Sequence, residues 1–489
     1  MSKLKLTGKL LRAIGLPQGP VISIVMNIME KNYKYSSEEE ALNILKNILA
    51  SPADYVDDDV LGMIASQLIP KTSSPHDGEI SLNQTGIAFN VFGADQIEPG
   101  AMQQMITAAK LPIAVAGALM PDAHTGYGLP IGGVLATENA VIPYGVGVDI
   151  GCRMCLSIFD IDPKELTARE NYFAREINEA TLFGAGAQFR AEATSEHEVT
   201  ERKLFDELPV LKALQDRARM QLGSSGSGNH FVEFGIVNIN ERDDMLDIEP
   251  GKYLGLLSHS GSRALGANIA NHYTKLAKQK IKLPGEAGNL AWLHLGEEEG
   301  VEYWLAMNLA GDYASANHHI IHEKIAKRLA SQPLKIIENH HNFAWKEIID
   351  GKEVIVHRKG ATPAGKNILG IIPGSMTAPG FIVKGKGEPA SLSSAAHGAG
   401  RKMSRSAALK SISQNVLKDE LAKHGVKLLG GGLDEAPFAY KDIEEVMKSQ
   451  KQLVGIVGTF TPKIVKMDGS APRQWRKTGQ GRSDALEGE

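Results

Sequence analysis

The spacing of hydrophobic and polar residues predicts helices at the start of the chain. In residues 35–49, a serine that can cap a helix is followed three residues later by a glutamate, and leucines and isoleucines then recur at helical intervals. A second helix is predicted over about residues 53–68, and residues 70–78 form a link rich in Pro, Ser, His, Asp and Gly. Residues 1–80 are therefore predicted to be a small helical appendage.

The pattern changes after about residue 82, where short runs of β character lie between glycine turns, as in residues 131–136 and 253–257. Strands that outnumber helices without a regular βαβ alternation indicate an α+β fold. We expect residues 81–469 to form the main body and residues 470–489, rich in Gly, Arg and Ser, to be a flexible tail. Helical spacing interrupts the strands over about residues 100–110, 163–183, 199–221, 262–281, 301–331 and 434–450.

Composition limits the classes of protein to consider. The chain has 489 residues, 43% of them hydrophobic and 22% charged, with a formal net charge of −4, so a polyanion would need a local basic groove. Two cysteines are too few for a disulfide framework and suit a reducing cytoplasm. We expect no signal peptide and no membrane span, because no apolar run approaches the roughly 20 residues that a bilayer requires. The sequence predicts a cytoplasmic protein.

Five potential metal ligands lie in separate polar or glycine-rich stretches, next to turns and outside periodic apolar runs. They are Asp149, Cys152, His230, His259 and His341. A carboxylate, a thiolate and three imidazoles form a ligand mix suited to one or two borderline divalent metals, provided that the fold brings them together.

Cys152 and Cys155 also form a CxxC pair, which leaves other interpretations open. Such a pair can be a redox centre, half of a zinc site, or two inert buried cysteines. No second CxxC exists, and no βαβ unit surrounds this one.

The Gly/Ser-rich stretch 223–228 exposes backbone N–H groups that suit a phosphate, although it matches neither a Walker A motif nor a dinucleotide fingerprint. A plain tight turn followed by an ordinary strand histidine, His230, is the alternative. Arg263, shortly after His259, has the geometry for a bidentate phosphate contact.

Two other clusters favour structural roles. His318 and His322 have the spacing of a helical zinc motif, but His319 occupies the position of the required glutamate, so a solvated or packed helix face is the preferred interpretation. Residues 57–59, three aspartates, lack the glycine and the spaced oxygen ligands of a calcium loop and are expected to begin a helix.

Basic residues concentrate in the later turns, where Arg358, Lys359 and Arg401 stand next to or near glycines and could bind a polyanion. His397 lies between small residues and the turn 398–401. An imidazole that reaches the α-phosphate of a nucleotide could act there as a nucleophile.

Taken together, these stretches resemble the RtcB family of RNA ligases. The matching motifs occur in order at residues 121–128 (PDAHTGYG), 146–152 (VGVDIGC), 228–231 (GNHF), 259–263 (HSGSR), 340–342 (HHN), 358–361 (RKGA), 372–376 (IPGSM), 394–405 (SAAHGAGRKMSR) and 436–442 (APFAYKD). The resemblance covers roughly residues 82–469. It implies an α+β fold with mixed and antiparallel sheets around a central metal site, and residues 81–469 as the catalytic domain.

The resemblance also implies two Mn²⁺ ions and GTP as cofactors. Cys152 would bridge the ions, with His259 and His341 completing one ligand set and Asp149 and His230 the other. His397 would be the nucleophile that carries GMP. The remaining GTP contacts would be Asn229, Phe231, Glu233, Ser375, Gly398, Ala399, Gly400 and Lys466, and the phosphate or RNA contacts would be Arg263, Arg358, Lys359 and Arg401.

The activity that the resemblance implies is the joining of an RNA 3′-phosphate or 2′,3′-cyclic phosphate end to a 5′-hydroxyl end, with an archease-like protein as a potential activator. A metal-dependent RNA end-processing phosphodiesterase and an RNA-binding protein with a vestigial ligase site are the alternatives.

Three positions depart from the family pattern. Tyr127 and His318 stand where relatives commonly carry a lysine and an arginine, and Lys466 matches the guanine-contacting lysine only loosely. Residues 1–80 have no counterpart in the minimal family body.

Overall fold

The computed structural model describes residues 4, 6–17, 20–69 and 80–469, so the predicted link at 70–78 and the predicted tail lie outside the described residues. The N-terminal segment is helical, as the pattern predicts. Its elements are α1 (Gly8–Ala13), α2 (Pro20–Asn32), α3 (Glu38–Ala50), η1 (Pro52–Tyr55) and α4 (Gly62–Leu68).

Local hydrogen bonds explain where these helices begin and end. Ser37 caps α3 and forms a capping box with Glu40. The single helix predicted over 53–68 is wrong, because Asp58 Oδ1 accepts hydrogen bonds from the backbone N–H groups of Val60 and Leu61 and α4 begins only at Gly62. The three aspartates therefore belong to a turn and do not begin a helix.

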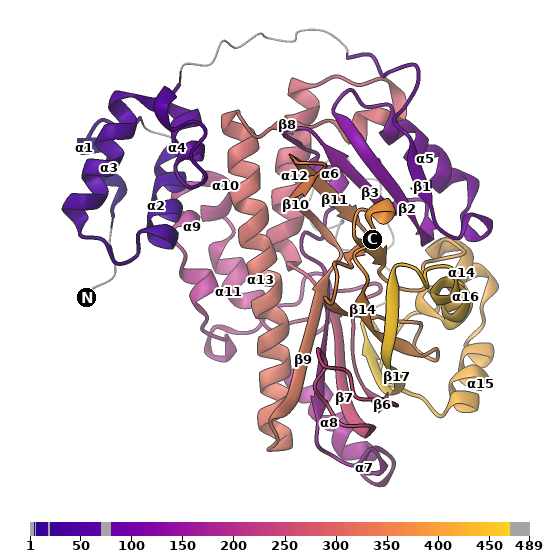
Figure 1. Cartoon of the computed structure of the whole chain (residues 1–489). Coiled ribbons are helices and arrows are strands. Elements are labelled where there is room, and N and C mark those ends of the chain that lie inside the picture. Colours follow the sequence, from indigo (N-terminus) through magenta and orange to yellow (C-terminus); the bar gives the residue numbers. More distant parts are fainter. Residues whose placement is uncertain (1–3, 5, 18–19, 70–79, 470–489) are drawn as a thin grey trace, which may run out of the picture.

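The N-terminal helices pack against the main body through apolar side chains. Their buried residues form one cluster with Val301 and Leu305 of α13 (Glu298–Leu329). Lys203 Nζ adds a hydrogen bond to the Leu6 carbonyl. Figure 1 shows this segment, in indigo, beside α9, α10 and α13.

The main body contains two larger sheets, which confirms the expected α+β class. The first has the order β1-β2-β3-β11-β10 and is antiparallel except for its β1–β2 pair. Its strands are β1 (Phe89–Val91), β2 (Ala114–His124), β3 (Ile131–Thr137), β11 (Lys352–Lys359) and β10 (Asn342–Ile349).

The second sheet has the order β13-β14-β17-β6-β7-β5-β9, with β16 beside β17. Its two edges approach each other, because the Asn339 side chain accepts from Ile371 N at 2.7 Å and donates to Ile371 O at 3.2 Å. The sheet is therefore nearly closed. Its strands are β13 (Leu369–Ile372), β14 (Gly380–Gly385), β17 (Val454–Met467), β6 (Phe231–Ile239), β7 (Gly251–Ser260), β5 (Arg153–Phe159), β9 (Pro333–His340) and β16 (Lys427–Leu428).

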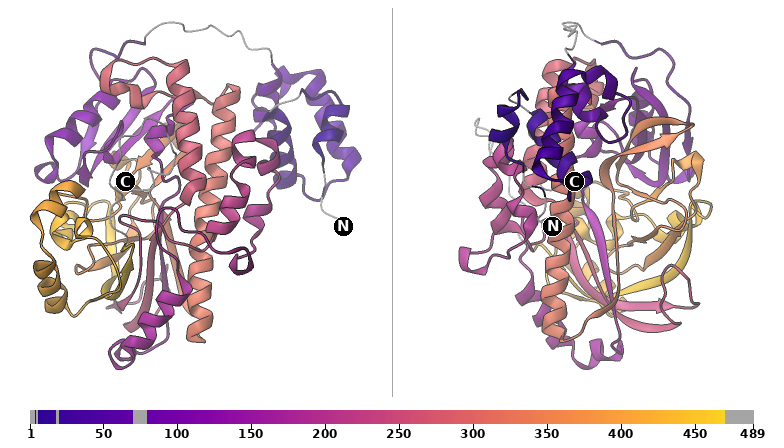
Figure 2. Two further views of the ribbon diagram at one scale, coloured as in Figure 1. Left: turned by 180° about the vertical axis from the view of Figure 1, so that it is seen from behind. Right: turned by 60° about the vertical axis from the view of Figure 1, so that its left-hand side comes forward.

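Two long helices, α12 (Arg263–Lys280) and α13, lie side by side and cover the sheets (Figure 2). The largest apolar cluster joins them and α5 (Pro99–Ala109) to the five-stranded sheet. Two short pairs, β4 (Ala140–Val141) with β8 (Leu293–His294) and β12 (Ala361–Pro363) with β15 (Ser394–Ala396), complete the strands of the described residues. None of the described helices is both long and apolar enough to cross a membrane.

In the main body, the helices predicted over 163–183, 199–221 and 434–450 are each broken into shorter ones. Pro209 and Pro437 interrupt the patterns at 199–221 and 434–450, because proline lacks a backbone N–H and restricts the residue before it. The short helices are α6 (Pro143–Val146), α7 (Lys164–Ala168), α8 (Glu170–Ala180), α9 (Leu204–Glu207), α10 (Pro209–Lys212), α11 (Gln215–Gln221), α14 (Arg405–Ser411), α15 (Gln414–His424) and α16 (Ile443–Lys448), with the 3-10 turns η2 (Ala94–Gln96), η3 (Ala191–Ala193), η4 (Glu198–Glu201), η5 (Gly285–Leu290), η6 (Pro389–Ser391), η7 (Leu433–Glu435) and η8 (Pro437–Ala439).

Candidate metal and nucleotide site

Antiparallel pairing brings four of the predicted metal ligands together at the ends of neighbouring strands in the eight-stranded sheet. Cys152 and His230 immediately precede β5 and β6, whereas His259 lies at the end of β7 and His341 immediately follows β9. These strands are neighbours in the order β6-β7-β5-β9, and all the pairs are antiparallel. The starts of two strands therefore meet the ends of the other two.

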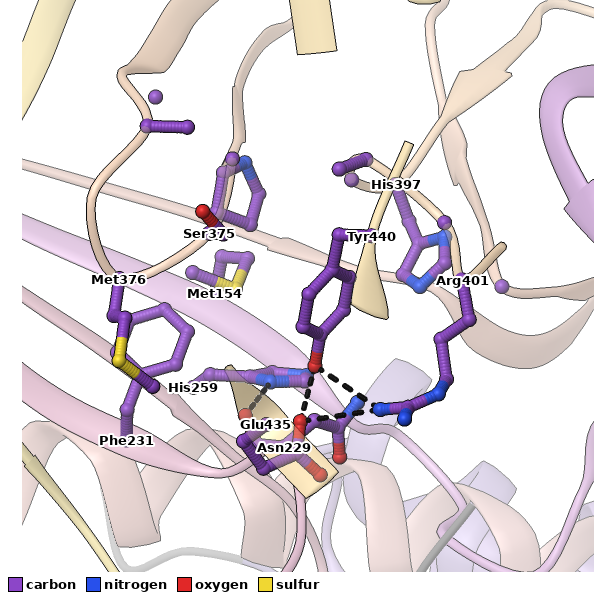
Figure 3. A pocket seen from close by; sticks show the side chains of 18 of the residues that line it. Met154, Asn229, Phe231, His259, Ser375, Met376, His397, Arg401, Glu435 and Tyr440 are labelled. Carbon is purple, nitrogen blue, oxygen red and sulfur yellow. Dashed lines mark hydrogen bonds and ion pairs between the residues drawn. The ribbon is translucent and has the colours of Figure 1, made fainter. Parts of the chain in front are cut away.

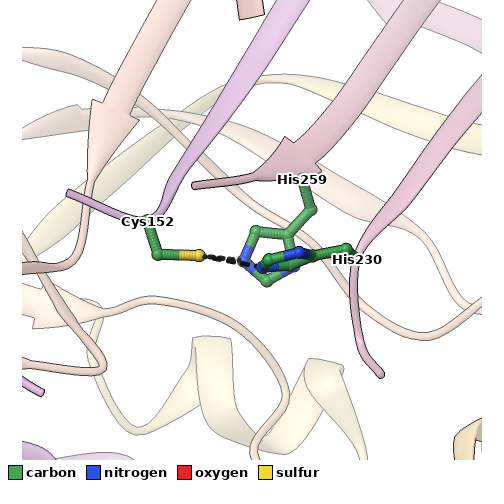
Figure 4. Close-up of side chains that lie close together, drawn as sticks. All are labelled: Cys152, His230 and His259. Atoms are coloured by element: carbon green, nitrogen blue, oxygen red, sulfur yellow. Dashed lines mark hydrogen bonds between the residues drawn. The ribbon is translucent and has the colours of Figure 1, made fainter. Parts of the chain in front are cut away.

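The ligand atoms of these residues face one another. Cys152 Sγ lies 3.1 Å from His259 Nε2 and 3.5 Å from His230 Nε2 (Figure 4). His259 Nε2 is 3.2 Å from His341 Nε2, and His230 Nε2 is 3.0 Å from Asp149 Oδ2. The structure thus brings together all five predicted ligands, which come from four separate stretches of the sequence.

The protonation of this cluster leaves lone pairs directed at its centre. His259 Nδ1 donates to the Asn229 carbonyl at 3.0 Å, and burial lowers the pKa of His259 to about 3, so its Nε2 is unprotonated. The Nε2 atoms of His230 and His341 also face the centre, 3.5 Å from Cys152 Sγ and 3.2 Å from His259 Nε2 respectively. A cation is the group that such a cluster can accommodate.

Burial raises the pKa of the Cys152 thiol well above its ordinary value, and the negative charge of Asp149 raises it further. A bound cation would act in the opposite direction and favour the thiolate, which is the form that ligates metals. The residues present therefore fit a divalent metal.

Glycines permit the close approaches around this cluster. Gly151 has a φ of +72°, and a Cβ on it would lie 2.9 Å from the Gly311 Cα atom of α13. A Cβ on Gly261 would lie 2.1 Å from an oxygen of Asp149. Both positions require glycine if Asp149 and Cys152 are to face the cluster.

A pocket lies directly beside this cluster of candidate metal ligands and contains His397. Its lining includes Cys152, His259 and His341 from the cluster. The rings of His341 and His397 are 4.8 Å apart between centroids. From the predicted nucleotide contacts, the pocket brings together Asn229, Phe231, Glu233, Ser375, His397, Gly398, Ala399 and Gly400 (Figure 3).

His397 is held by Asp122, a residue to which the sequence reasoning assigned no role. Asp122 Oδ2 accepts from His397 Nδ1 at 2.7 Å, from His397 N at 3.1 Å and from Gly398 N at 3.3 Å. Asp122 is fully buried, at the end of β2. With Nδ1 as the donor, a neutral His397 ring has its lone pair on the other ring nitrogen. The only sequence signal for Asp122 was its place in the 121–128 motif.

Lys441 supports the strand that carries Asp122. Its Nζ donates to the carbonyls of Pro121 and Ala123, at 3.2 and 2.7 Å. Lys441 was also missed by the sequence reasoning, although it lies within the 436–442 motif. These two hydrogen bonds from Lys441, one to the residue before Asp122 and one to the residue after it, fix the position of the Asp122 carboxylate.

Glu233 places an acidic side chain in the pocket. Burial raises the pKa of its carboxyl well above the ordinary value. A ligand that offers N–H donors to this carboxylate would offset the cost of burying its charge.

One wall of the pocket consists of side chains that hydrogen-bond to one another: Arg401, Arg405, Glu435 and Tyr440. Arg401 donates to Glu435 and to the Tyr440 hydroxyl, and the guanidinium lies 5.2 Å from the Tyr440 ring centroid (Figure 3). Arg405 also contacts Glu435. This network fixes one wall of basic and phenolic groups next to His397.

The other predicted phosphate contacts differ in accessibility. Lys359 lines the pocket, and its Nζ donates to the Tyr127 carbonyl at 2.9 Å. Arg358 is 1% exposed, and its guanidinium bonds Glu347, Ser394 and the Leu392 carbonyl.

Arg263 is also buried, and it donates to Ser224 Oγ at 3.2 Å and to the Gly184 carbonyl at 2.7 Å. It therefore braces the Gly/Ser-rich loop that precedes His230. A phosphate would have to displace internal partners of Arg263 and of Arg358.

Lys466 does not reach the pocket. Val465 and Met467, its neighbours in β17, line the pocket, whereas Lys466 Nζ lies 3.4 Å from the Thr181 carbonyl and 3.5 Å from the Asn178 carbonyl. Successive residues of a strand point to opposite faces, so β17 directs Lys466 away from the nucleotide contacts.

Cys155 is separate from Cys152. Both are free and buried, but Cys155 groups with His318 and His322 of α13, on the helix side of the sheet. His318 and His322 are 0% and 3% exposed, so they belong to the packed helix face that was one expected interpretation. A CxxC redox pair does not fit this arrangement.

Comparisons with known proteins agree with this geometry. A family model described as "tRNA-splicing ligase RtcB" matches residues 104–468. RNA-splicing ligase RtcB of Escherichia coli K12 is 34% identical over 395 residues, covering 74% of this chain and 93% of that protein. tRNA-splicing ligase RtcB of Methanococcus maripaludis is 31% identical over 427 residues, covering 72% of this chain and 88% of that protein. The chain belongs to the RtcB family.

Proposed function

We propose that this protein is an RNA ligase that uses GTP and two Mn²⁺ ions to join RNA ends. One end carries a 3′-phosphate or a 2′,3′-cyclic phosphate, the other a 5′-hydroxyl, and His397 carries GMP between them. The observation that supports this best is the Asp122–His397 contact, at 2.7 Å, beside the five-ligand cluster. The names of the relatives, as RNA- and tRNA-splicing ligases, support an RNA substrate.

The metal ligands would be the five residues of the cluster. Cys152 Sγ lies within 3.5 Å of the Nε2 atoms of His230 and His259, so these three residues, together with His341 and Asp149, would hold the ions. Bound divalent ions would neutralise charge on the phosphoryl oxygens of the substrate.

The guanine base would bind at Glu233 and Phe231. The Watson–Crick edge of guanine presents N1–H and N2–H donors side by side, which match the two oxygens of a carboxylate, whereas adenine presents an acceptor at N1. The Glu233 carboxylate would therefore select GTP over ATP. The Phe231 ring, which also lines the pocket, offers an apolar surface to the base.

The first reaction forms a bond between His397 and the nucleotide. The free lone pair of His397 Nε2 attacks the α-phosphorus of GTP, the bond to the β-phosphate oxygen breaks, and pyrophosphate leaves. The ring becomes positively charged, and the Asp122 carboxylate stabilises this charge through Nδ1–H.

Two further displacements then join the RNA. An oxygen of the RNA 3′-phosphate attacks the phosphorus on His397, and the N–P bond breaks to restore the neutral imidazole. The 5′-hydroxyl oxygen next attacks the RNA 3′-phosphorus, loses its proton, and releases GMP. A 2′,3′-cyclic phosphate first requires hydrolysis by water to the 3′-phosphate.

The RNA phosphates would approach from the side of Lys359 and Arg401, the two predicted contacts that line the pocket. Tyr127 is 59% exposed, and its backbone carbonyl accepts a hydrogen bond from Lys359 Nζ. An aromatic ring at this place could stack on a base, where a lysine would contact a phosphate.

The test is a joining assay with two short RNAs, one ending in a 3′-phosphate and one starting with a 5′-hydroxyl. We expect a joined product that requires both GTP and Mn²⁺ and is lost in His397→Ala. His424→Ala, on the partly exposed end of α15, is the matched control and should join as the parent does. Ends that are hydrolysed but never joined would indicate a phosphodiesterase, and RNA that is bound but unchanged would indicate a binding protein.

A further inference from the structure

The layer between α13 and the eight-stranded sheet is polar, although it is buried. Arg153 donates to the Gly311 carbonyl of α13 at 2.8 Å and pairs with Glu338 of β9 at 3.2 Å. Asn317 of α13 accepts from Gly223 N at 2.7 Å. Buried polar layers of this kind fix the relative position of their elements only when every group has a partner.

Within this layer, four side chains form a continuous hydrogen-bonded chain. Ser157 Oγ lies 2.7 Å from His322 Nδ1, and His322 Nε2 lies 2.7 Å from Ser258 Oγ. Ser258 Oγ lies 2.6 Å from His318 Nδ1, and His318 Nε2 lies 3.0 Å from the Ser260 carbonyl. All five residues are buried, so no solvent competes for these contacts.

The Ser260 carbonyl, at the end of this hydrogen-bonded series, fixes the position of every proton in it. A carbonyl can only accept, so His318 Nε2 carries the hydrogen. Burial lowers the pKa of His318 well below its ordinary value and that of His322 to about 3, so both rings are neutral. His318 Nδ1 must then accept from Ser258, whose single hydrogen is used there, and Ser258 must accept from His322 Nε2–H. His322 Nδ1 accepts from Ser157.

This proton order also argues against a metal at Cys155, His318 and His322, despite their proximity. Each of the four imidazole nitrogens already has a partner of the correct polarity. The Ser258 hydroxyl occupies the point at which the two rings converge. The Cys152 cluster differs, because its imidazole Nε2 atoms face a thiol and one another instead of hydroxyl and carbonyl groups.

This series of hydrogen bonds includes both residues that flank His259, Ser258 and Ser260. Ser258 and Ser260 point to the α13 side of β7, and His259 between them points to the metal cluster, because strand residues alternate. Any twist of β7 at this point would move His259 Nε2 away from Cys152. The hydrogen bonds that run from Ser157 through His322, Ser258 and His318 to the Ser260 carbonyl resist such a twist.

We propose that Ser157, His322, Ser258 and His318 form a proton-ordered relay that positions His259 for metal binding from the opposite face of β7. These are positioning residues, and they do not touch the substrate or the metals. The inference rests on the metal centre of the proposed function. It assigns a role to His318, which departs from the family pattern, and to a helix face that the reaction itself does not use.

The test is a Co²⁺ titration of the metal-free protein, followed through the visible and near-ultraviolet bands of Co²⁺ bound to thiolate and imidazole. Ser258→Ala removes the centre of the relay and should raise the Co²⁺ dissociation constant about tenfold and shift the bands, as outer-shell changes do at metal sites. Ser157→Ala, at the far end, should have a smaller effect. Ser315→Ala is the matched control, because Ser315 lies in the same polar layer but bonds Glu338 and is not in the relay.

Thermal unfolding of the metal-free variants separates positioning from general destabilisation. The relay is supported if Ser258→Ala loses Co²⁺ affinity and Ser315→Ala does not, at similar melting temperatures. Equal affinities and spectra in all variants would overturn it, and so would a further ion, beyond the two of the Cys152 cluster, that binds at Cys155, His318 and His322 and is lost in Ser258→Ala.

Failure of the metal centre itself has a different signature. A parent protein that binds no Co²⁺ would contradict the proposed function. The relay would then be tested by itself, through nitrogen NMR of labelled histidines, which reports the tautomer of each ring. The relay requires Nε2–H tautomers for both His318 and His322. Any other tautomer or a doubly protonated ring would contradict it.

Discussion

Replacing Asp122 with asparagine tests how the nucleophile is activated. The carboxylate accepts three hydrogen bonds on one oxygen, from His397 Nδ1, His397 N and Gly398 N. The carboxamide oxygen of Asp122→Asn can accept the same three, so the ring orientation and its tautomer should persist. What the variant lacks is the negative charge next to the imidazole.

The distance gives the size of the expected effect. Two unit charges 2.7 Å apart interact by 332/(20 × 2.7), or about 6 kcal/mol, at an effective dielectric constant of about 20. If about half of the ring's charge has developed in the transition state, the loss is about 3 kcal/mol, which corresponds to a rate reduction of roughly 150-fold. Asp122→Ala should be slower still, because it also frees the ring to rotate.

The assay is the single-turnover rate of protein labelling by GTP that carries ³²P at the α-phosphate. Asp312→Asn is the control, since Asp312 lies in α13 and pairs with Arg202 outside the pocket. Labelling of Asp122→Asn within about threefold of the parent rate would refute electrostatic stabilisation by Asp122.

Three other changes have expected outcomes. Cys152→Ala should abolish metal loading, measured by elemental analysis, and Cys155→Ala should leave it nearly unchanged; equal losses would instead indicate a CxxC site. Glu233→Gln should weaken GTP binding by roughly 10- to 150-fold, the value of about 1.5–3 kcal/mol for hydrogen bonds to a charged group, while ATP binding stays the same; unchanged discrimination between the two nucleotides would contradict the placement of guanine. Burial lowers the pKa of His357 to about 4, below its unfolded value of about 6.5, so its contribution to stability is complete above pH 6.5 and falls by about 3 kcal/mol as the pH drops to 4. Melting curves should therefore show a smaller loss between pH 7 and pH 4.5 for His357→Asn than for the parent, and parallel losses would exclude this residue as a cause.

The sequence pattern predicted the fold class and the long elements, and it failed where short-range chemistry competes with periodicity. The helix α13 and the strands β3 and β7 lie close to their predicted positions. The helix predicted over 199–221 was broken because Pro209 cannot continue it, and the one over 53–68 because Asp58 bonds the next backbone amides. Periodicity records which face is apolar and contains no information about such local bonds.

Among the candidate site residues, the sequence singled out those whose chemistry is visible in the side chain. The five candidate metal ligands and His397 stood out because a carboxylate, a thiol and imidazoles next to glycine turns are recognisable as ligands or nucleophiles from the side chain alone. Asp122 and Lys441 did not, since their role depends on which backbone groups the fold places beside them. The orientation of Lys466 likewise depended on the register of β17, which a single lysine in a strand does not reveal.

Covalent labelling of the protein by α-labelled GTP with Mn²⁺ decides whether His397 carries GMP. We expect one labelled residue, His397, through a bond that is broken by acid and stable to alkali, as for a phosphoramidate. We expect no label in His397→Ala, although this variant should still bind metal. A folded, metal-loaded parent protein that takes up no label, or a label that persists in His397→Ala, would contradict this role of His397.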